Sequence, residues 1–371
     1  MIDKKPNSHA GIYFRITSKK PVTDFLDIIR SPMMRKIYAS IKKHVLQMKA
    51  HVRNESFYCN ALCGNSDYNI SVNSDMTVSC HCQGDNKEGI IGDLSKGDFK
   101  NVFFGPVANS FRRSLSRGVL PIPTCSRCGE LRTVGKSEAA AKASSGATPI
   151  GIMIENTIAC NLTCISCLQK MLETPRTKRR MTLDDIRKLS SEVHDNNIQK
   201  VYFFKYGEPF LSPTVYEELE ILRKQNPSLM IIISTNGNML ETARKREAAL
   251  FADHIFFSID GVTDEMVSHY QRGSSFTKAY ENMKELVRLR NERGLKKPVI
   301  DWKYVLFNWN DRPEAIDAAI GLAKKCGIDI LSFWQTNTPY YGKSFRHYYR
   351  NVAQPCWKGW EIRFSDAGDV R

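Results

Sequence analysis

The sequence predicts an α/β protein in which a partial (β/α)6 TIM-like barrel follows a small cysteine-rich domain. From residue 149 onward, short apolar runs of strand length alternate with longer stretches of helix length. Such alternation is typical of βαβ units with a parallel sheet, and about six units fall short of the eight in a complete barrel. The second observation is that nine of the 11 cysteines lie in tight groups before residue 168. Close spacing of this kind indicates ligation of a metal or a cluster.

The composition is that of an ordinary globular protein, because 42% of the 371 residues are hydrophobic and 25% are charged. This excludes wholesale disorder and a collagen-like repeat. The net charge of +15 attracts anions without choosing among nucleic acids, nucleotides, acidic peptides and membrane headgroups. The N-terminus lacks the apolar core of a signal peptide, and no stretch reaches the ~18 apolar residues of a membrane-spanning helix. We therefore expect a cytoplasmic protein with no membrane partner, in which the cysteines stay reduced.

Four regions follow from changes in texture along the chain. Residues 1–130 form an N-terminal region, within which residues 59–130 combine short alternating runs, frequent Gly and Asn, and six cysteines. That combination is typical of a small loop-rich module held together by metal. Residues 131–148, rich in Ala, Ser and Lys, are expected to be a linker. The barrel then occupies residues 149–335, and residues 336–371 form a C-terminal segment.

The predicted barrel elements alternate regularly. The apolar runs expected to form its strands are residues 150–154, 200–204, 230–233, 254–258, 299–307 and 328–333. One helix begins at Thr182, where Asp185 three residues later gives an acidic variant of the capping box. Further helices are expected near residues 213–225, 241–251, 276–293 and 312–326. Functional residues of such barrels lie at the carboxyl ends of the strands, so the loops after each strand are the place to look.

The loop after the first predicted strand contains three closely spaced cysteines, Cys160, Cys164 and Cys167, in the pattern C-x3-C-x2-C. Three thiolates can hold three irons of a 4Fe–4S cluster, which leaves the fourth iron open for another ligand. A zinc site completed by a distant Cys or His is the alternative. Three cysteines in one short loop of a βα repeat favour the cluster.

At this loop the chain resembles the radical S-adenosylmethionine (SAM) superfamily, and the resemblance covers about residues 149–335. The resemblance implies that SAM binds the open iron through its amino and carboxylate groups. It also implies reductive cleavage of SAM to methionine and a 5′-deoxyadenosyl radical, which abstracts hydrogen from the substrate. An electron donor such as flavodoxin or ferredoxin is implied as a partner. The radical chemistry belongs to the cofactor, while the protein orients and insulates it.

The resemblance extends to the loops after the later strands. Gly207 and Glu208 match the family's Gly-Gly-Glu-Pro segment, in which Tyr206 replaces the first Gly. The SAM contacts that the resemblance implies are Gly207, Glu208, Asn236, Ser258, Asp260 and Arg272. After the fifth predicted strand, Asn310 is expected to face the adenosine of SAM, with Asn308 as the alternative. One departure is Ser166, which stands where the family usually has an aromatic residue packed on adenine. Leu168 or Phe307 is expected to supply that contact instead.

The N-terminal cysteines resemble the SPASM/Twitch module, which carries an auxiliary 4Fe–4S cluster. The four ligands implied are Cys63, Cys80, Cys125 and Cys128, with Cys59 and Cys82 as spare or alternative ligands. A zinc-ribbon-like knob is the alternative. In the family this module normally follows the barrel, whereas here it precedes it. The segment around Cys356 is similar to the opening strand of a second such module.

The predicted function is therefore that of a radical SAM oxidoreductase or maturase. Its substrate is a peptide or a small molecule, and the reaction is a dehydrogenation, an epimerisation or a peptide crosslinking that the auxiliary cluster assists. The competing hypothesis is a non-enzymatic, zinc-stapled nucleic-acid-binding protein, for which the net charge of +15 is the argument. The sequence carries no RNA-reading motif of the usual kinds, which disfavours nucleic acid as a partner.

Overall fold

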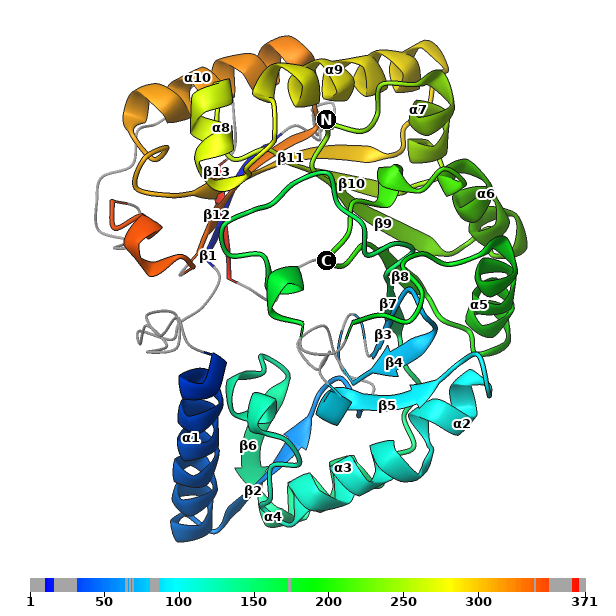
Figure 1. The fold of residues 1–371 in the computed structure, drawn as a ribbon, viewed down its shortest axis with the longest axis vertical. Helices are drawn as coiled ribbons and strands as arrows, with labels where there is room; N and C mark the ends of the chain where they lie inside the picture. Colours follow the sequence, from blue (N-terminus) through cyan, green and yellow to red (C-terminus); the bar gives the residue numbers. More distant parts are fainter. Residues whose placement is uncertain are drawn as a thin grey trace, which may run out of the picture. The chain divides into compact units, whose positions relative to one another are not determined.

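The computed structural model describes residues 11–16, 32–63, 66, 68, 70–80, 87–172, 175–336, 338–346 and 362–366. The chain divides into two compact units (Figure 1). The N-terminal unit comprises Ile28–Cys160 and Cys167–Ile233, and the C-terminal unit comprises Met1–Asp27, Asn161–Ser166 and Ser234–Arg371. The cysteine loop of residues 160–167 therefore contributes to both units.

The N-terminal unit is built on a mixed sheet. Its strands are β3 (Ile70–Val72), β4 (Thr77–Ser79), β5 (Ile90–Asp93), β7 (Gly151–Ile154), β8 (Lys200–Phe203) and β9 (Met230–Thr235). Strands β7, β8 and β9 pair in parallel, with Ile152 opposite Val201. Strand β3 joins the free edge of β7, also in parallel, while β4 and β5 continue the sheet in antiparallel fashion. All four residues of β7 are buried, as expected for a parallel strand that is covered on both faces.

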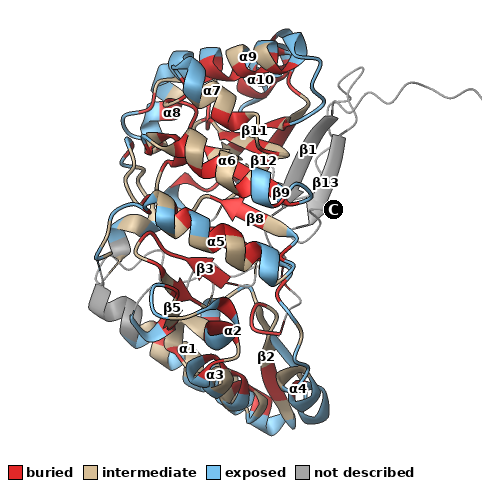
Figure 2. Ribbon diagram, turned by 90° about the vertical axis from the view of Figure 1, so that its right-hand side faces the viewer, coloured by how far each residue is buried: buried red, intermediate tan, exposed pale blue. Residues whose placement is uncertain are grey.

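Helices and a small second sheet complete the N-terminal unit. The helices are α1 (Pro32–Val52), α2 (Phe99–Phe103), α3 (Pro106–Ser116), α4 (Lys136–Ala143), α5 (Leu183–Asp195) and α6 (Val215–Gln225). Helices α5 and α6 lie on the outer side of β8 and β9 (Figure 2). The capping box predicted at Thr182 is confirmed, because its hydroxyl accepts from the Asp185 amide and the Asp185 carboxylate accepts from the Thr182 amide. The second sheet pairs β2 (Glu55–Cys59) with β6 (Leu131–Gly135) in antiparallel fashion.

The structure differs from the predicted division of the chain at residues 131–148. Instead of a linker, this segment contains β6 and α4, and β6 pairs with β2 from the cysteine-rich part. The cysteine-rich part also shares a sheet with the first barrel strands, because β3 pairs with β7. The cysteine-rich part and the first barrel strands therefore belong to the same compact unit.

The C-terminal unit contains a parallel sheet. Strands β10 (His254–Ser258), β11 (Val299–Leu306) and β12 (Ile330–Gln335) pair in sequence, then β1 (Gly11–Ile16) pairs with β12 and β13 (Ile362–Asp366) pairs with β1. The helices are α7 (Ala243–Ala249), α8 (Asp264–Tyr270), α9 (Phe276–Glu292) and α10 (Pro313–Cys326). The predicted barrel strands begin and end within two residues of the observed ones. The chain is a mixed α/β protein with mostly parallel strands, consistent with a partial barrel.

Part of the predicted C-terminal segment lies outside the described residues, and so does Cys356. The same holds for Cys82 in the cysteine-rich part. Within the residues that the structure does describe, no helix combines the length and apolarity needed to cross a membrane.

Candidate cluster and cofactor sites

The cysteine loop follows β7 and leads into a short 3-10 helix, Leu168–Met171. The side chains of Cys160, Cys164 and Cys167 are all half-buried. Backbone hydrogen bonds hold the loop within each unit. In the N-terminal unit the Glu208 amide donates to the Ala159 carbonyl at 2.9 Å. In the C-terminal unit the Thr163 and Ile165 amides donate to the carbonyls of residues 272 and 270, at 3.0 and 3.1 Å.

The Gly207-Glu208 turn after β8 approaches the same stretch of chain closely. A Cβ atom at Gly207 would lie 1.9 Å from the Thr157 carbonyl oxygen, so only glycine fits there. Glu208 is 2% exposed, and its carboxylate accepts a hydrogen bond from the Phe210 amide at 3.2 Å. The turn predicted to hold SAM is therefore pressed against the backbone that leads into the cysteine loop.

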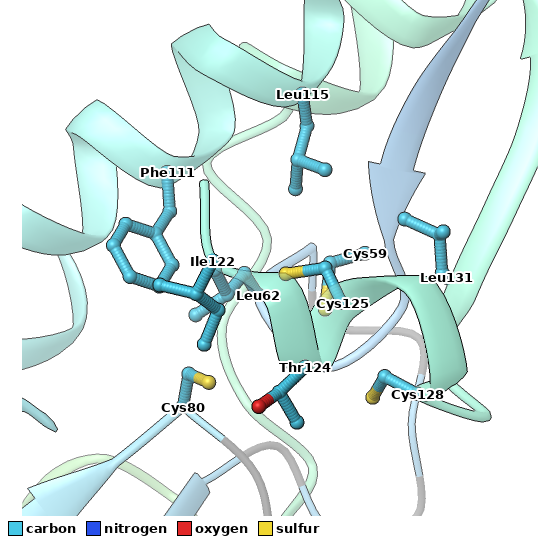
Figure 3. Close-up of a pocket in the computed structure, with 10 residues that line it drawn as sticks. All are labelled: Cys59, Leu62, Cys80, Phe111, Leu115, Ile122, Thr124, Cys125, Cys128 and Leu131. Atoms are coloured by element: carbon cyan, nitrogen blue, oxygen red, sulfur yellow. The ribbon is translucent and has the colours of Figure 1, made fainter. Parts of the chain in front are cut away.

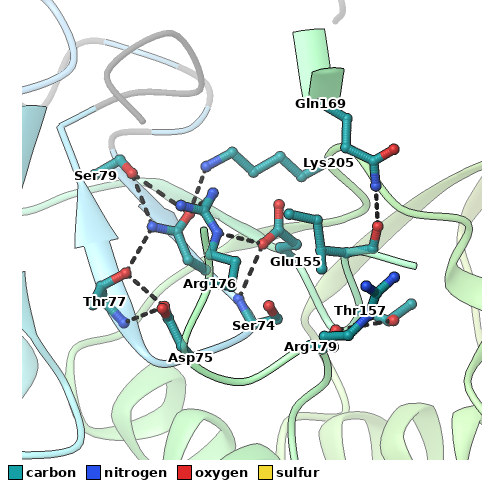
Figure 4. Close-up of polar contacts among 12 residues, drawn as sticks. Ser74, Asp75, Thr77, Ser79, Glu155, Thr157, Gln169, Arg176, Arg179 and Lys205 are labelled. Carbon is teal, nitrogen blue, oxygen red and sulfur yellow. Dashed lines mark hydrogen bonds and ion pairs between the residues drawn. The ribbon is translucent and has the colours of Figure 1, made fainter. Parts of the chain in front are cut away.

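A buried ion pair lies at the carboxyl end of β7 (Figure 4). The Arg176 Nε and Glu155 Oε1 atoms are 2.9 Å apart, and the two side chains are 3% and 0% exposed. Arg176 and Lys205 both donate to the Asn73 side-chain oxygen, at 3.0 and 2.6 Å. The Ser74 amide donates to Glu155 at 3.2 Å. This network joins the β3–β4 turn to the segments that follow β7, the cysteine loop and β8.

The network around Glu155 is not among the features predicted from the sequence. The available signal was a carboxylate placed directly after a buried apolar strand, because such a charge requires a partner. That partner, Arg176, is 21 residues away in the sequence. Spacing alone could not identify it.

Among the predicted SAM contacts in the C-terminal unit, Asn236 contacts the cysteine loop directly. Its side-chain Nδ2 donates to Asn161 Oδ1 at 2.9 Å, and its Oδ1 accepts from the Asn238 amide at 2.9 Å. Gly237 follows with φ = 76°, a left-handed conformation that favours glycine. The Ser258 hydroxyl lies 3.3 Å from that of Ser234.

Asp260 and Asn310 form one buried polar group. Asp260 is 3% exposed and accepts from the Val305 amide at 2.9 Å. Burial raises the pKa of Asp260 to about 7, although the Val305 hydrogen bond and the Lys303 charge oppose this shift. Asn310 donates to the Asp260 and Val305 carbonyls at 2.8 and 3.0 Å and accepts from the Phe307 amide. Because these bonds use both of its donors, Asn310 positions the backbone around Asp260.

The Arg272 side chain is exposed, and the Arg272 carbonyl accepts the hydrogen bond from the Thr163 amide. Of the two expected adenine contacts, Leu168 is 47% exposed. Phe307 is fully buried and stacks on Trp309, with ring centroids 4.6 Å apart.

A cavity of about 380 Å³ lies in the C-terminal unit, within the usual range for small-molecule sites. Its lining comprises Tyr270, Lys303, Val305, Phe307, Trp334, Gln335 and Thr336. The Lys303 ammonium lies 4.2 Å from the centroid of the Trp334 ring. The lining residues of β11 and β12 are close to the carboxyl ends of these strands, where sites of parallel folds are found. The cavity thus combines a cation with flat aromatic surfaces.

Four cysteines line a second cavity, in the N-terminal unit (Figure 3). They are Cys59 at the end of β2, Cys80 after β4, and Cys125 and Cys128 at the 3-10 helix Pro123–Arg127. Three of the four predicted auxiliary ligands are therefore brought together. The fourth, Cys63, is buried but does not line the cavity.

The thiols of this cavity influence one another. Burial raises the pKa of Cys59 well above its usual range, and the neighbouring Cys128, Cys80 and Cys125 raise it further, against a hydrogen bond from the Leu62 backbone. Burial also raises the pKa of Cys125. A metal centre that takes the place of the protons would remove the repulsion among the thiolates, because its positive charge lies between them.

Comparison with known proteins connects the first site to a family. Residues 154–319 match the family model described as the Radical SAM superfamily. A GTP 3′,8-cyclase from Chlorobaculum tepidum is 28% identical over 145 residues, which cover 38% of this chain and 42% of that protein. The chain thus spans less than half the length of this curated relative.

Solved structures give weaker likenesses. The structure described as native anSMEcpe with bound AdoMet has a TM-score of 0.38 and 19% identity, covering 50% of this chain and 51% of that chain. The radical S-adenosylmethionine methyltransferase TsrM from Kitasatospora setae, with cobalamin and a [4Fe-4S] cluster bound, has a TM-score of 0.39 and 15% identity. That alignment covers 57% of this chain and 38% of the methyltransferase.

Proposed function

We propose that this chain, whose residues 154–319 match the family model of the Radical SAM superfamily, is an enzyme that cleaves SAM reductively and abstracts hydrogen from its substrate. The observation that carries the proposal is the C-x3-C-x2-C loop directly after β7, which lies inside the matched region. Radical SAM proteins bind a 4Fe–4S cluster and SAM, and a loop of three thiols fits a cluster with one open iron. The donor set therefore agrees with the cofactor of the family.

Cys160, Cys164 and Cys167 are assigned as the cluster ligands. When bound, the cluster supplies the electron that cleaves SAM into methionine and a 5′-deoxyadenosyl radical, which takes a hydrogen atom from the substrate. Gly207 lets the backbone approach closely, and Glu208 offers a buried carboxylate for the SAM ammonium. The remaining proposed SAM contacts are Asn236, Ser258, Asp260 and Arg272, with Asn310 in a positioning role.

The cavity lined by Lys303 and Trp334 is proposed as the substrate site of the C-terminal unit. A cation beside an aromatic plane favours a substrate that combines an anionic group with a flat or apolar part. Both a peptide with a carboxylate and a small metabolite with an acidic group have this chemistry.

We further assign an auxiliary 4Fe–4S cluster to the cysteine-rich part of the N-terminal unit. Its role is to take up an electron from the substrate during oxidation, which makes the enzyme an oxidoreductase or a peptide maturase. The electron that starts each turnover is assigned to a small donor protein such as flavodoxin or ferredoxin.

The test uses the full chain, purified and reconstituted without oxygen. Iron and sulfide per chain are measured together with 5′-deoxyadenosine formed from SAM under dithionite. We expect about eight irons, as for two cubanes, and formation of 5′-deoxyadenosine. Zinc in place of iron, with no 5′-deoxyadenosine, would contradict the proposal and favour the zinc-stapled binding protein.

The Cys164→Ala variant is expected to form 5′-deoxyadenosine at a rate at least ~100-fold below that of the parent, because removing one of three ligands disrupts the cluster. Cys326→Ala is the matched control, since Cys326 is buried at the end of α10, away from the cysteine loop in sequence. The control is expected to retain cleavage. Cleavage retained in Cys164→Ala would refute the assignment of the loop.

A further inference from the structure

We propose that the auxiliary cluster is held by Cys59, Cys80, Cys125 and Cys128, with Cys63 outside the ligand set and Arg112 as the buried counter-charge. This assignment rests on the proposed function for the kind of metal centre and adds its ligands. It revises the set implied by sequence resemblance, in which Cys63 took the place of Cys59.

Cys59, Cys80, Cys125 and Cys128 line one shared cavity. Its four thiols come from three separate segments of the chain, namely the end of β2, the residue after β4 and the 3-10 helix Pro123–Arg127 with its C-terminal cap. The other lining side chains are apolar except for Thr124 (Figure 3). The thiols are therefore the natural metal donors of this cavity, and four of them suffice for a complete cubane.

Cys63 has different electrostatic surroundings from Cys59. Cys128, Cys80 and Cys125, the three other cavity cysteines, act electrostatically on Cys59, and so does Arg112. The charges that act on Cys63 are those of Arg112 and Lys142. Cys63 is 4% exposed, and its amide donates to the Cys59 carbonyl at 3.0 Å. It supports the turn that carries Cys59.

Arg112 is a buried cation with one unsatisfied donor among the described residues. Arg112 on α3 is 6% exposed, and it donates to the Leu62 and Phe103 carbonyls, each at 2.8 Å. Its guanidinium also lies 4.7 Å from the centroid of the Phe103 ring. Within the described part of the chain, its Nη2 atom has no hydrogen-bond partner. A buried charge without an opposite charge is destabilising, so this position favours a neighbouring anion.

A tetrathiolate cluster supplies that anion. Four thiolates carry more negative charge than a cubane core carries positive charge, so the complete cluster remains anionic. Arg112 interacts electrostatically with both Cys63 and Cys59, which places its charge beside the cavity. The guanidinium thus compensates the cluster and offers it a hydrogen-bond donor.

The test isolates this second site in the full chain. Cys160, Cys164 and Cys167 are replaced together by Ala, and the triple-alanine chain is reconstituted without oxygen. Iron, sulfide and zinc are measured, and the dithionite-reduced sample is recorded by low-temperature EPR. We expect about four irons and four sulfides per chain, with the signal of a reduced four-iron cluster.

Two further substitutions in the triple-alanine chain are matched. Cys59→Ala is expected to lose the four-iron EPR signal, whereas Cys63→Ala is expected to keep both the signal and the iron. Circular dichroism monitors folding, and Cys63→Ser repeats the control if the alanine variant loses its native spectrum. Loss of the signal in a folded Cys63 variant, or its survival in Cys59→Ala, would overturn the ligand set. About one zinc without sulfide would overturn the cubane.

Arg112 is tested through the midpoint potential. A buried cation stabilises the more negative, reduced cluster and so raises its potential. We expect Arg112→Gln to shift the midpoint to a more negative value and Arg112→Lys, which keeps the charge, to stay near the parent. Equal potentials in the two variants would remove Arg112 from the proposal. Because the triple-alanine chain lacks the loop ligands, none of these results depends on whether the enzyme cleaves SAM.

Discussion

The carboxyl group of Asp260 links the stability of the C-terminal unit to pH. Burial raises its pKa from 3.8 to about 7. Between these values the folded protein keeps a proton that the unfolded chain has already released. The unfolded state therefore binds fewer protons, and the stability contributed by this group falls as the pH rises from about 4 to about 7.

Asp260→Asn is expected to remove this dependence. The amide keeps an acceptor for the Val305 amide but has no proton to lose. One pKa unit corresponds to ~1.4 kcal/mol. As the pH rises from about 4 to about 7, the free energy of unfolding of the variant should therefore come to exceed that of the parent by at most ~4 kcal/mol. Thermal unfolding of both proteins between pH 4 and pH 8, without SAM, measures the difference. Parallel curves would show that Asp260 titrates as an exposed carboxylate.

Single residues also mark how far the sequence could predict the sites. The three loop cysteines could be identified because their spacing and their place after a strand are both local features. The choice between Cys59 and Cys63 could not be made in this way. The two cysteines are four residues apart, and which thiol faces the cavity depends on the turn between them and on β6 and α3. The expected contact of Asn310 with SAM shows the same limit of local patterns. The bonds of Asn310 to the Asp260 and Val305 carbonyls form only in the folded chain, so the sequence could not reveal them.

At the scale of elements, the Glu155–Arg176 pair fastens the segment after the cysteine loop to the end of β7. The pair is almost fully buried, and Asn73 from the β3–β4 turn joins it. Breaking a buried ion pair by removing one partner leaves the other charge uncompensated, at a cost of ~3–5 kcal/mol. The elements around the proposed cluster loop should therefore depend on this one contact.

Arg176→Met is expected to lower the free energy of unfolding by about that amount, ~3–5 kcal/mol, and to reduce iron retention by the cysteine loop. Arg187→Met is the matched control. It breaks the ion pair between Arg187 and Asp184 on α5, two side chains that are 60% and 90% exposed. Such exposed pairs contribute less than ~1 kcal/mol to the free energy of unfolding. Urea unfolding and iron analysis of both variants provide the measurement. Equal losses of stability would contradict the special role of the buried pair.

The barrel strands could be predicted because each is a short, nearly continuous apolar run between turn residues. Strand β6 lacks this pattern, since its residues are exposed or half-buried. The Ala-rich segment of α4 has only one buried residue, Ala139. Both elements depend on contacts with their partners β2 and α3. Local composition carries no information about these partners. The predicted linker was therefore a segment of weak local signal within a folded unit.

At the scale of the whole molecule, distant parts of the sequence pair in ways that no local pattern indicates. Strand β1 pairs with β12, with Gly11 opposite Ile330, and β13 pairs with β1. Strand β3 pairs with β7, with Ile70 opposite Ile152. The sequence predicted the α/β class and the order of the barrel elements. The attachment of the cysteine-rich part to the sheet through β3 depends on these long-range contacts.

The pairing of β3 with β7 also has a consequence for how the protein is made. All four cavity cysteines, the last of them Cys128, precede β7, which begins at Gly151. The ribosome, adding ~5–20 residues per second, completes this part ~10–40 s before it reaches the end of β12 at Gln335. For the first ~1–5 s of that interval, until β7 is translated, the edge of β3 has no partner strand from the barrel. All four cavity cysteines are added before Cys160, the first proposed ligand of the SAM-cleaving cluster. Biosynthesis thus makes the proposed auxiliary site available for iron before the proposed SAM-cleaving site.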